Sequence, residues 1–220
     1  MKGSRVGIRA FVFDMDGTIL HSLPDLVIAT NKALVQMGYP TRTYDEILAF
    51  VGNGSKRLIG QACPPGTSPE KRAETFELWR QIYIASPYAH TEPFPDVVET
   101  LVELRRRNVK TAVLSNKFDA GVRVLSDRFF PGLFDIVRGE VPPTPRKPDP
   151  TALLAILNEL GVQPEDAAYV GDTRVDVEVS RNAGVKAVGV SWGYDTAAPL
   201  PQDELDAYIQ RPRDLLLLAE

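Results

Sequence analysis

Two aspartates stand one residue apart, Asp14 and Asp16, at the end of an apolar run that reads FVFDMDGT over residues 11–18. In an extended strand, residues i and i+2 point to the same side, so the two carboxylates are expected to share a small space. Like charges at that separation repel each other, and a cation or a shared proton must relieve the repulsion. The pair therefore predicts a place for chemistry at the end of this run.

Further polar groups follow other apolar runs of the chain. Ser115 and Asn116 come after a second run, and Asp172 comes after a third. Asp176 lies one helical turn beyond Asp172, on the same side of the helix expected there. In an open parallel sheet the functional crevice lies at the carboxyl ends of the strands, so these groups are expected to converge.

The residue types in this set favour phosphate chemistry. Carboxylate oxygens suit Mg²⁺ better than zinc, and Lys147, in the proline-rich loop VPPTPRKPDP, adds a fixed positive charge. Gly17 allows a sharp turn, while the hydroxyl groups of Thr18 and Ser115 can bind a phosphate group. With one acid placed to attack and another to move protons, the set predicts phosphoryl transfer through an aspartyl phosphate.

The elements that must position these groups alternate along the chain. Four short runs rich in Val, Phe and Ala are apolar on both faces, as buried parallel strands are: 10–13, 111–114, 167–170 and 187–190. Four helical patterns separate or flank the later runs: 96–107, 119–129, 150–160 and 176–183. This order predicts an α/β fold, with a Rossmann-like parallel sheet as its core and helices on both faces.

The first connection is far too long for a simple crossover. The first strand ends near residue 14 and the next begins near residue 109, whereas a crossover unit needs only about 30 residues. A helical pattern that begins at Ser22 or Asp25 stops at Gly38, where a C-terminal glycine is typical.

Two capping signals predict further helices in this insertion. Thr43 and Glu46 have the spacing of a capping box, and Ser68 followed by Pro69 suits the start of another helix, which ends near Ala85. We therefore expect an all-helical cap domain over residues 20–93. The α/β core is then discontinuous, with residues 1–19 and 94–220.

Composition excludes several classes of function. The 220 residues carry a net charge of −4 and have a pI near 5.4, so no global positive field attracts nucleic acid or an anionic membrane. A single cysteine, Cys63, excludes an internal disulfide, and no apolar run is long enough to span a bilayer. The expected location is the cytoplasm, and the sequence leaves the oligomeric state open.

Other catalytic and nucleotide-binding motifs fail. No G-x-x-x-x-G-K-[ST] occurs, which excludes a P-loop. VGNGSKRLIG at 51–60 looks like a dinucleotide fingerprint, but Arg57 stands where the third glycine belongs. His21 and His90 allow a Ser/His/Asp triad on paper, yet the G-x-S-x-G elbow is absent.

Four motifs in order resemble those of the haloacid dehalogenase superfamily of phosphohydrolases: DMDGT at 14–18, LSN at 114–116, the lysine of RKPDP at 147, and GDTRVD at 171–176. The insertion between the first and second motifs resembles the small helical cap of one class of that superfamily. The resemblance implies a Mg²⁺-dependent phosphatase that acts on a small phosphorylated metabolite.

The resemblance also implies a role for each matching residue. Asp14 is expected to be the nucleophile, and Asp16 the general acid that protonates the leaving alcohol and then the base that activates water. Ser115 and Lys147 are expected to bind the transferring phosphoryl group, helped by the backbone around Asn116.

The magnesium ligands follow from the same resemblance. Mg²⁺ is expected on Asp14, on the backbone carbonyl of Asp16 and on Asp172, while Asp176 acts through water or behind the direct ligands. The presence of Asp16 argues against the dehalogenase branch, whose chemistry does not need that acid.

Three further stretches are similar to the branch of bacterial phosphoglycolate phosphatases: VGNG at 51–54, TEPFPDV at 91–97 and SNKFDA at 115–120. They favour 2-phosphoglycolate as the substrate. One departure concerns the cap hinge, where His21 stands before Ser22 and the branch usually carries an aspartate. A pyrophosphatase, a sugar-phosphate phosphatase or mutase, and a non-catalytic binding protein on the same fold stay open as alternatives.

The cap turn formed by Gly52, Asn53 and Gly54 permits two interpretations. It is a tight turn that caps the next helix, or it also lies over the core site when the cap closes. In the second case its N–H groups, with Lys56 or Arg57, contact the far end of the substrate.

Overall fold

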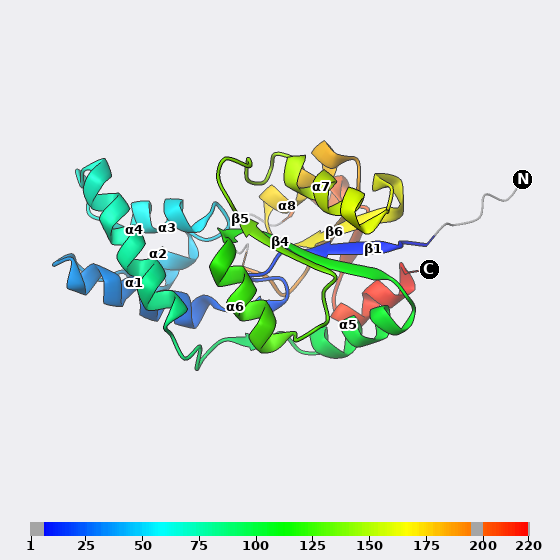
Figure 1. Ribbon diagram of the computed structural model, residues 1–220, viewed down its shortest axis with the longest axis horizontal. Helices are drawn as coiled ribbons and strands as arrows, with labels where there is room; N and C mark the ends of the chain where they lie inside the picture. The colour runs from blue at the N-terminus through cyan, green and yellow to red at the C-terminus, as the bar shows by residue number, and fades with distance from the viewer. Residues whose placement is uncertain (1–6, 195–199, 220) are drawn as a thin grey trace, which may run out of the picture.

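A six-stranded parallel sheet forms the centre of the computed structural model, which describes residues 7–194 and 200–219 (Figure 1). Its strand order is β5-β4-β1-β6-β7-β8. The strands are β1 (Ala10–Phe13), β4 (Lys110–Phe118), β5 (Ile136–Glu140), β6 (Ala167–Gly171), β7 (Lys186–Val190) and β8 (Ala207–Ile209). The expected α/β class with a Rossmann-like parallel core is confirmed.

Both faces of the sheet are buried. Phe11 and Phe13 of β1 pack toward the layer that holds α5 (Val97–Arg106), α6 (Asp119–Phe129) and the 3-10 segment η3 (Pro212–Leu217). Ala10 and Val12 pack toward the layer that holds α7 (Thr151–Leu160) and α8 (Arg174–Ala183). This two-sided burial is the physical reason why the strand sequence is apolar at every position.

The four predicted strands and four predicted core helices are present, but two strands of the sheet carry no clear signal in the sequence. β5 reads IVRGE and is only half-buried along its length, and β8 has three residues, of which one is buried. Both lie at the edges of the sheet. An edge strand shares less of its surface with the core, so its sequence need not be apolar throughout.

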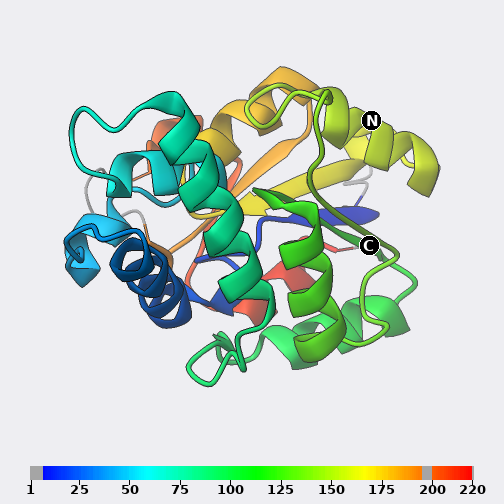
Figure 2. The ribbon, with the colours of Figure 1, turned by 60° about the vertical axis from the view of Figure 1, so that its left-hand side comes forward.

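Four helices lie between β1 and β4 in the sequence and form a group beside the sheet: α1 (Leu23–Gln36), α2 (Tyr44–Leu48), α3 (Ser55–Ala62) and α4 (Pro69–Ile84) (Figures 1 and 2). α4 packs on α1 and α3 and also reaches α6 of the core. The capping box of Thr43 and Glu46 is formed, and the Ser68 side chain accepts a hydrogen bond from the N–H of Lys71.

The two crossings between this group and the sheet pair with each other. β2 (Leu20–His21) runs antiparallel to β3 (Glu92–Pro93). The His21 ring packs against Phe94, with centroids 5.8 Å apart, and its Nδ1 lies 3.1 Å from the hydroxyl of Tyr194. The histidine that departs from the resemblance therefore belongs to an aromatic cluster at the hinge. The domain boundaries at 19/20 and 93/94 stay a prediction.

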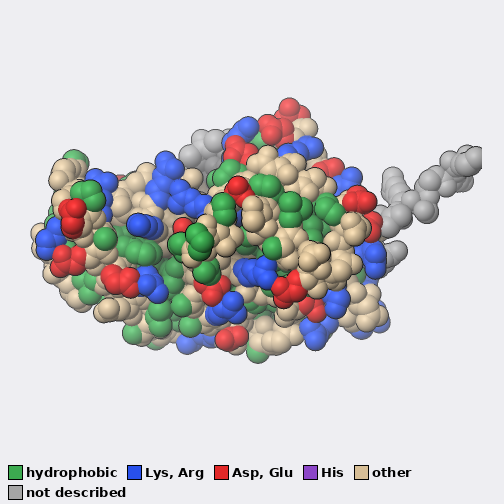
Figure 3. Space-filling model, turned by 45° about the horizontal axis from the view of Figure 1, so that its top comes forward, with side chains coloured by type: hydrophobic (Ala, Val, Ile, Leu, Met, Phe, Trp, Pro, Cys, Tyr) green, Lys and Arg blue, Asp and Glu red, His purple; other side chains and the backbone are tan. Residues whose placement is uncertain are grey.

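The surface carries mixed charge. Basic and acidic side chains are interspersed over the face shown in Figure 3, in keeping with the small net charge. Within residues 7–194 and 200–219, no helix is both long and apolar enough to cross a membrane.

Candidate active site

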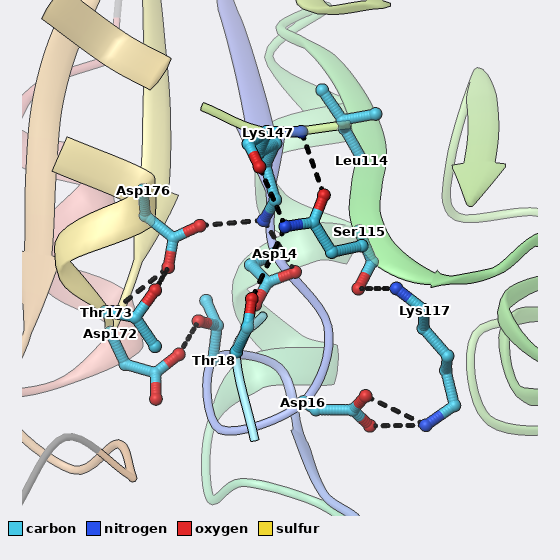
Figure 4. A network of polar contacts seen from close by, with 12 residues as sticks. Asp14, Asp16, Thr18, Leu114, Ser115, Lys117, Lys147, Asp172, Thr173 and Asp176 are labelled. Atoms are coloured by element: carbon cyan, nitrogen blue, oxygen red, sulfur yellow. Dashed lines mark hydrogen bonds and ion pairs between the residues drawn. The ribbon is translucent and has the colours of Figure 1, made fainter. Parts of the chain in front are cut away.

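The ends of three neighbouring strands bring the predicted residues together (Figure 4). Asp14 follows β1 directly, Asp172 follows β6 directly, and Ser115 lies in the last part of β4. β1 is the middle strand of the three, paired in parallel with β4 and β6. The parallel arrangement therefore places all three side chains together at the carboxyl ends of the central strands.

A cluster of three buried acids forms at these strand ends. Asp14, Asp172 and Asp176 each offer one carboxylate oxygen, and these oxygens lie within 4.8 Å of one another. The side chains of Thr18 and Thr173 donate hydrogen bonds of 2.7 Å to Asp172 and Asp176 respectively. These short threonine contacts fix two of the three carboxylates before any ligand arrives.

Lys147 supplies the positive charge beside the acids. Its Nζ lies 3.0 Å from Oδ1 of Asp14 and 2.7 Å from Oδ1 of Asp176, and it contacts the hydroxyl of Tyr169 at 2.7 Å. Burial opposes the charged form, but the carboxylates of Asp14 and Asp176 raise the pKa of Lys147 well above its usual value. The lysine is therefore a permanent cation in this site.

One lysine does not neutralise three acids. Burial raises the pKa of Asp14 from 3.8 to about 6, Lys147 opposes that shift, and Asp176 and Asp16 add to it. Burial, Asp176 and Asp14 likewise raise the pKa of Asp172 well above its usual value. The site thus holds an excess of negative charge that disfavours its own ionised form.

The donor set fits a hard divalent cation. With all three acids ionised, three carboxylates and one ammonium leave two uncompensated negative charges. Among the described residues, Oδ1 of Asp14 is buried and accepts no hydrogen bond of good geometry, although Lys147 lies close to it. Oxygen ligands of this kind and number are those that Mg²⁺ prefers.

The carboxylate of Asp16 lies apart from the acid cluster. It turns toward β4, where the Nζ of Lys117 donates hydrogen bonds of 3.0 and 2.8 Å to its two oxygens (Figure 4). The hydroxyl of Ser22 also donates a hydrogen bond to it. The two carboxylates therefore have different partners, because the backbone turns after β1 and a separate lysine pairs with each acid. Both acids nevertheless line one small cavity.

Gly17 makes that turn possible. Its φ is +89°, a value that disfavours residues with a Cβ, and a Cβ added there would lie 2.3 Å from Oδ2 of Asp172. The glycine therefore allows the turn and the buried acid to occupy adjacent space. The neighbouring Thr18 contributes its hydroxyl to Asp172, as described above.

Asn116 holds the lysine loop in place. Its side chain accepts a hydrogen bond of 2.9 Å from the backbone N–H of Lys147 and donates one of 3.1 Å to the backbone carbonyl of the same residue. The Asn116 side chain also lies 3.4 Å from the carbonyl oxygen of Gly52 in the cap turn. The amide thus positions Lys147 and joins it to the cap. The neighbouring Ser115 lines the cavity between the strand ends and the cap.

A small cavity of about 30 Å³ lies between the strand ends and the cap. Asp14, Asp16 and Ser115 line it from the core, and Gly52 and Gly54 line it from the cap turn. The turn therefore closes over the site. Asn53 instead lines a neighbouring cavity of about 400 Å³, whose other wall includes Thr173 and Arg174.

The two cations of the cap that the sequence singled out lie elsewhere. Lys56 and Arg57 are exposed on α3 and line an open groove of about 710 Å³, together with Arg42 and Arg72. The helix begins at Ser55, so successive residues point in different directions, and Ser55 and Leu58 are the ones that face the small cavity.

Several residues that shape the site were not predicted from the sequence. Their partners come from distant parts of the chain, and spacing along the sequence cannot reveal such contacts. The unpredicted residues are Ser22 and Lys117 beside Asp16, Tyr169 beside Lys147, Thr173 beside Asp176, and Tyr194 beside Asp172. The one usable signal was the position of Lys117 and Thr173, each within two residues of a predicted site residue.

Comparisons with known proteins identify the family to which the chain is similar. The family model described as haloacid dehalogenase-like hydrolase matches residues 11–190. The chain is 34% identical over 219 residues to phosphoglycolate phosphatase 1 of Pseudomonas aeruginosa, covering 96% of this chain and 80% of that protein. It is 32% identical over 214 residues to phosphoglycolate phosphatase of Aquifex aeolicus, covering 97% of each. A solved structure of a candidate phosphoglycolate phosphatase from Lactobacillus delbrueckii subsp. bulgaricus superposes with a TM-score of 0.87, at 28% identity, covering 97% of this chain and 100% of that one.

Proposed function

The chain belongs to the haloacid dehalogenase-like hydrolase family and is a phosphatase. We propose that it hydrolyses a small phosphomonoester through an aspartyl phosphate, with the help of Mg²⁺, and that its preferred substrate is 2-phosphoglycolate. The observation that carries the proposal is the buried contact of Asp14 with Lys147 at the edge of the acid cluster. A buried carboxylate beside a fixed cation suits attack on a phosphoryl group, because the cation can stabilise the charge on the phosphoryl oxygens.

In the first half of the reaction, an oxygen of Asp14 attacks phosphorus and the bond from phosphorus to the substrate alcohol breaks. Lys147 and the hydroxyl of Ser115 hold the phosphoryl oxygens. Asp16 donates a proton to the departing alcohol oxygen, so that the alcohol leaves neutral.

In the second half, Asp16 accepts a proton from water, which attacks the phosphorus of the aspartyl phosphate. The bond from phosphorus to Asp14 breaks, and inorganic phosphate and the free carboxylate result. Asp16 acts as acid and then as base, so each turnover restores its protonation state.

The residues that would hold Mg²⁺ are Asp14, the backbone carbonyl of Asp16, and Asp172, with Asp176 behind them. When bound, Mg²⁺ supplies positive charge to the phosphoryl oxygens and to the buried carboxylates. The hydrogen bonds from Thr18 to Asp172 and from Thr173 to Asp176 support this assignment, because they orient the carboxylates.

The narrow space between the strand ends and the cap turn supports a small substrate. The cavity there measures only about 30 Å³ and opens to solvent on one side. The apolar side chains of Leu26 and Leu58 also line it and help to exclude water. A compact leaving group such as glycolate fits these limits better than a sugar does.

A sugar phosphate is the second candidate, because of the adjoining cavity of about 400 Å³. The cap turn lies between the two spaces, since Val51 and Gly52 line both. A shift of this turn would join them and provide room for a larger leaving group.

The test is phosphate release from p-nitrophenyl phosphate, with and without Mg²⁺, followed by a panel of 2-phosphoglycolate, pyrophosphate and sugar phosphates. We expect turnover that needs Mg²⁺ and the highest kcat/KM for 2-phosphoglycolate. Absence of turnover on the whole panel would favour a non-catalytic protein. Conversion of a sugar phosphate to its isomer without release of phosphate would favour a mutase.

A further inference from the structure

Lys117 is a buried cation to which the mechanism above assigns no role. Its side chain is 2% exposed, at the end of β4 directly after Ser115 and Asn116. Among the described groups, its ammonium donates hydrogen bonds to Asp16 alone, at 2.8 and 3.0 Å to the two carboxylate oxygens. A buried ammonium is costly unless other groups compensate its charge, so its remaining surroundings matter.

The second group at this ammonium belongs to the cap. The Nζ of Lys117 lies 4.6 Å from the ring centroid of Tyr83 in α4, within the range of a cation–π contact. Tyr83 is fully buried, and its ring packs on Trp79 of the same helix at 5.1 Å and on Phe118 of β4 at 6.1 Å. The residue after Lys117 thus takes part in the same contact between cap and core.

Asp16 is also held by the residue at which the cap begins in the sequence. Ser22, the residue before α1, donates its hydroxyl hydrogen bond to Oδ1 of Asp16. The start of the first cap helix and the last turns of α4 therefore both determine where this carboxylate lies. In Figures 1 and 2, α1 and α4 lie side by side, in agreement with their packing.

We propose that Lys117 is a positioning residue that couples the packing of the cap helix α4, through Tyr83, to the orientation of the Asp16 carboxylate. This inference rests on the proposed function, in which Asp16 protonates the leaving group. With α4 in place, the Tyr83 ring and Asp16 together hold the ammonium, and the ammonium fixes the direction in which Asp16 points. When Asp16 carries its proton, one oxygen accepts from the ammonium and the other holds the proton toward the leaving group. Displacement of α4 removes the ring and loosens the carboxylate, so proton transfer is efficient only when the cap is packed.

The test uses two aryl substrates of similar shape. Phenyl phosphate needs a proton on its leaving oxygen, whereas p-nitrophenyl phosphate releases a stable anion and needs much less help. The readout is the ratio of kcat/KM for the nitrophenyl ester to that for the phenyl ester, since kcat/KM reports the steps up to departure of the alcohol. Contact of Lys117 with substrate phosphate would lower both values equally and leave the ratio unchanged.

Lys117→Met keeps the length of the side chain and removes its charge. We expect the ratio to rise by about tenfold or more, as a part of the full ~10²–10⁴ that acid catalysis supplies. Lys117→Arg should return the ratio most of the way to the wild-type value. In an Asp16→Asn background, Lys117→Met should leave the ratio unchanged, and this double variant also avoids an unpaired buried carboxylate. An equal loss of kcat/KM on both esters in Lys117→Met would overturn the proposal.

The link to the cap has its own matched pair of variants. Tyr83→Phe keeps the aromatic face and should keep the ratio of the wild type, whereas Tyr83→Leu removes the face and should raise the ratio toward that of Lys117→Met. Circular dichroism and thermal melts confirm that each variant folds. A ratio in Tyr83→Leu that equals the wild-type ratio would refute the coupling. Failure of the wild type to release phosphate from these esters and from every member of the substrate panel would instead refute the proposed function.

Discussion

The backbone N–H of Tyr194 donates a hydrogen bond of 2.7 Å to Oδ2 of Asp172, and the hydroxyl of the same tyrosine lies at the start of the first cap helix. That hydroxyl accepts hydrogen bonds from the backbone N–H groups of Ser22 and Leu23, at 2.7 and 3.0 Å. One residue therefore links the acid cluster to the hinge of the cap. It also satisfies N–H groups that a helix start leaves without partners.

Tyr194→Phe should weaken this hinge. The change removes the acceptor of two N–H groups and keeps the ring, so we expect the free energy of unfolding to fall by about 1–2 kcal/mol, as for loss of a helix cap. Urea denaturation measures this change. Tyr208→Phe is the matched control, because Tyr208 is 39% exposed on β8 and should tolerate the change. Equal effects of the two substitutions would contradict the role of the Tyr194 hydroxyl.

Gly17→Ala should damage the acid cluster. The added Cβ would lie 2.3 Å from Oδ2 of Asp172, so the carboxylate must move. Misplacement of about 1 Å at a site can cost ~10²-fold in rate, and we expect a loss of kcat/KM of that order together with weaker binding of Mg²⁺.

Gly38→Ala is the control for backbone strain. Gly38 has a φ of +72°, but a Cβ there meets nothing within 4 Å. We expect a stability cost of about 1 kcal/mol, because a residue with a Cβ is strained at positive φ, and an unchanged kcat/KM. Normal Mg²⁺ binding and activity in Gly17→Ala would show that the close packing of Gly17 against the Asp172 carboxylate is not needed for function.

Binding of Mg²⁺ should weaken as the pH falls through about 6, the raised pKa of Asp14. Protons and the metal compete for the same carboxylates, so calorimetric titration should give a lower affinity below this pH than above it. The Asp119→Asn variant, altered at an exposed ion pair with Arg123, should behave like the wild type. An affinity that does not change across this range would contradict the assignment of Asp14 as a ligand.

The same pKa shift predicts how the metal-free protein responds to pH. The folded state holds the Asp14 proton up to about pH 6, while the usual value is 3.8, so the folded state binds more protons between these limits. In the presence of a chelator, the free energy of unfolding should therefore rise as the pH falls from above 6 toward 4. The contribution of Asp14 is of the order of 3 kcal/mol, since one pKa unit corresponds to about 1.4 kcal/mol. Asp14→Asn should remove that part of the pH dependence.

Much of the core could be predicted because burial and strand order determine which residue types occur at each position of the sequence. β1 is apolar at all four positions because both of its faces are covered, and its predicted bounds match the structure. The parallel order of strands then brings Asp14, Ser115 and Asp172 to one edge. Local signals such as the Thr43 capping box were also reliable, because the partners lie three residues apart.

The remainder depends on contacts that no local pattern contains. Asp16 and Lys117 are 101 residues apart in the chain, so no local pattern could predict the ion pair between them. Alternation of side chains along a strand predicted a shared space for Asp14 and Asp16, and both line one small cavity, but alternation could not reveal that each acid pairs with a different lysine. The placement of Lys56 and Arg57 outside the small cavity likewise depends on how α3 is rotated against the core.

The central claim is that Asp14 takes the phosphoryl group, and the most direct measurement is the phosphatase activity of Asp14→Asn at saturating Mg²⁺. The fold should survive, because the change removes a buried charge whose ionised form is disfavoured. With the fold verified by circular dichroism, we expect kcat/KM to fall by ~10⁴ or more, as for loss of a nucleophile. The control Asp127→Asn, at an exposed position on α6, should retain wild-type activity. If Asp14→Asn kept more than about a hundredth of wild-type activity, a margin far outside that expected loss, the aspartyl-phosphate mechanism would be contradicted.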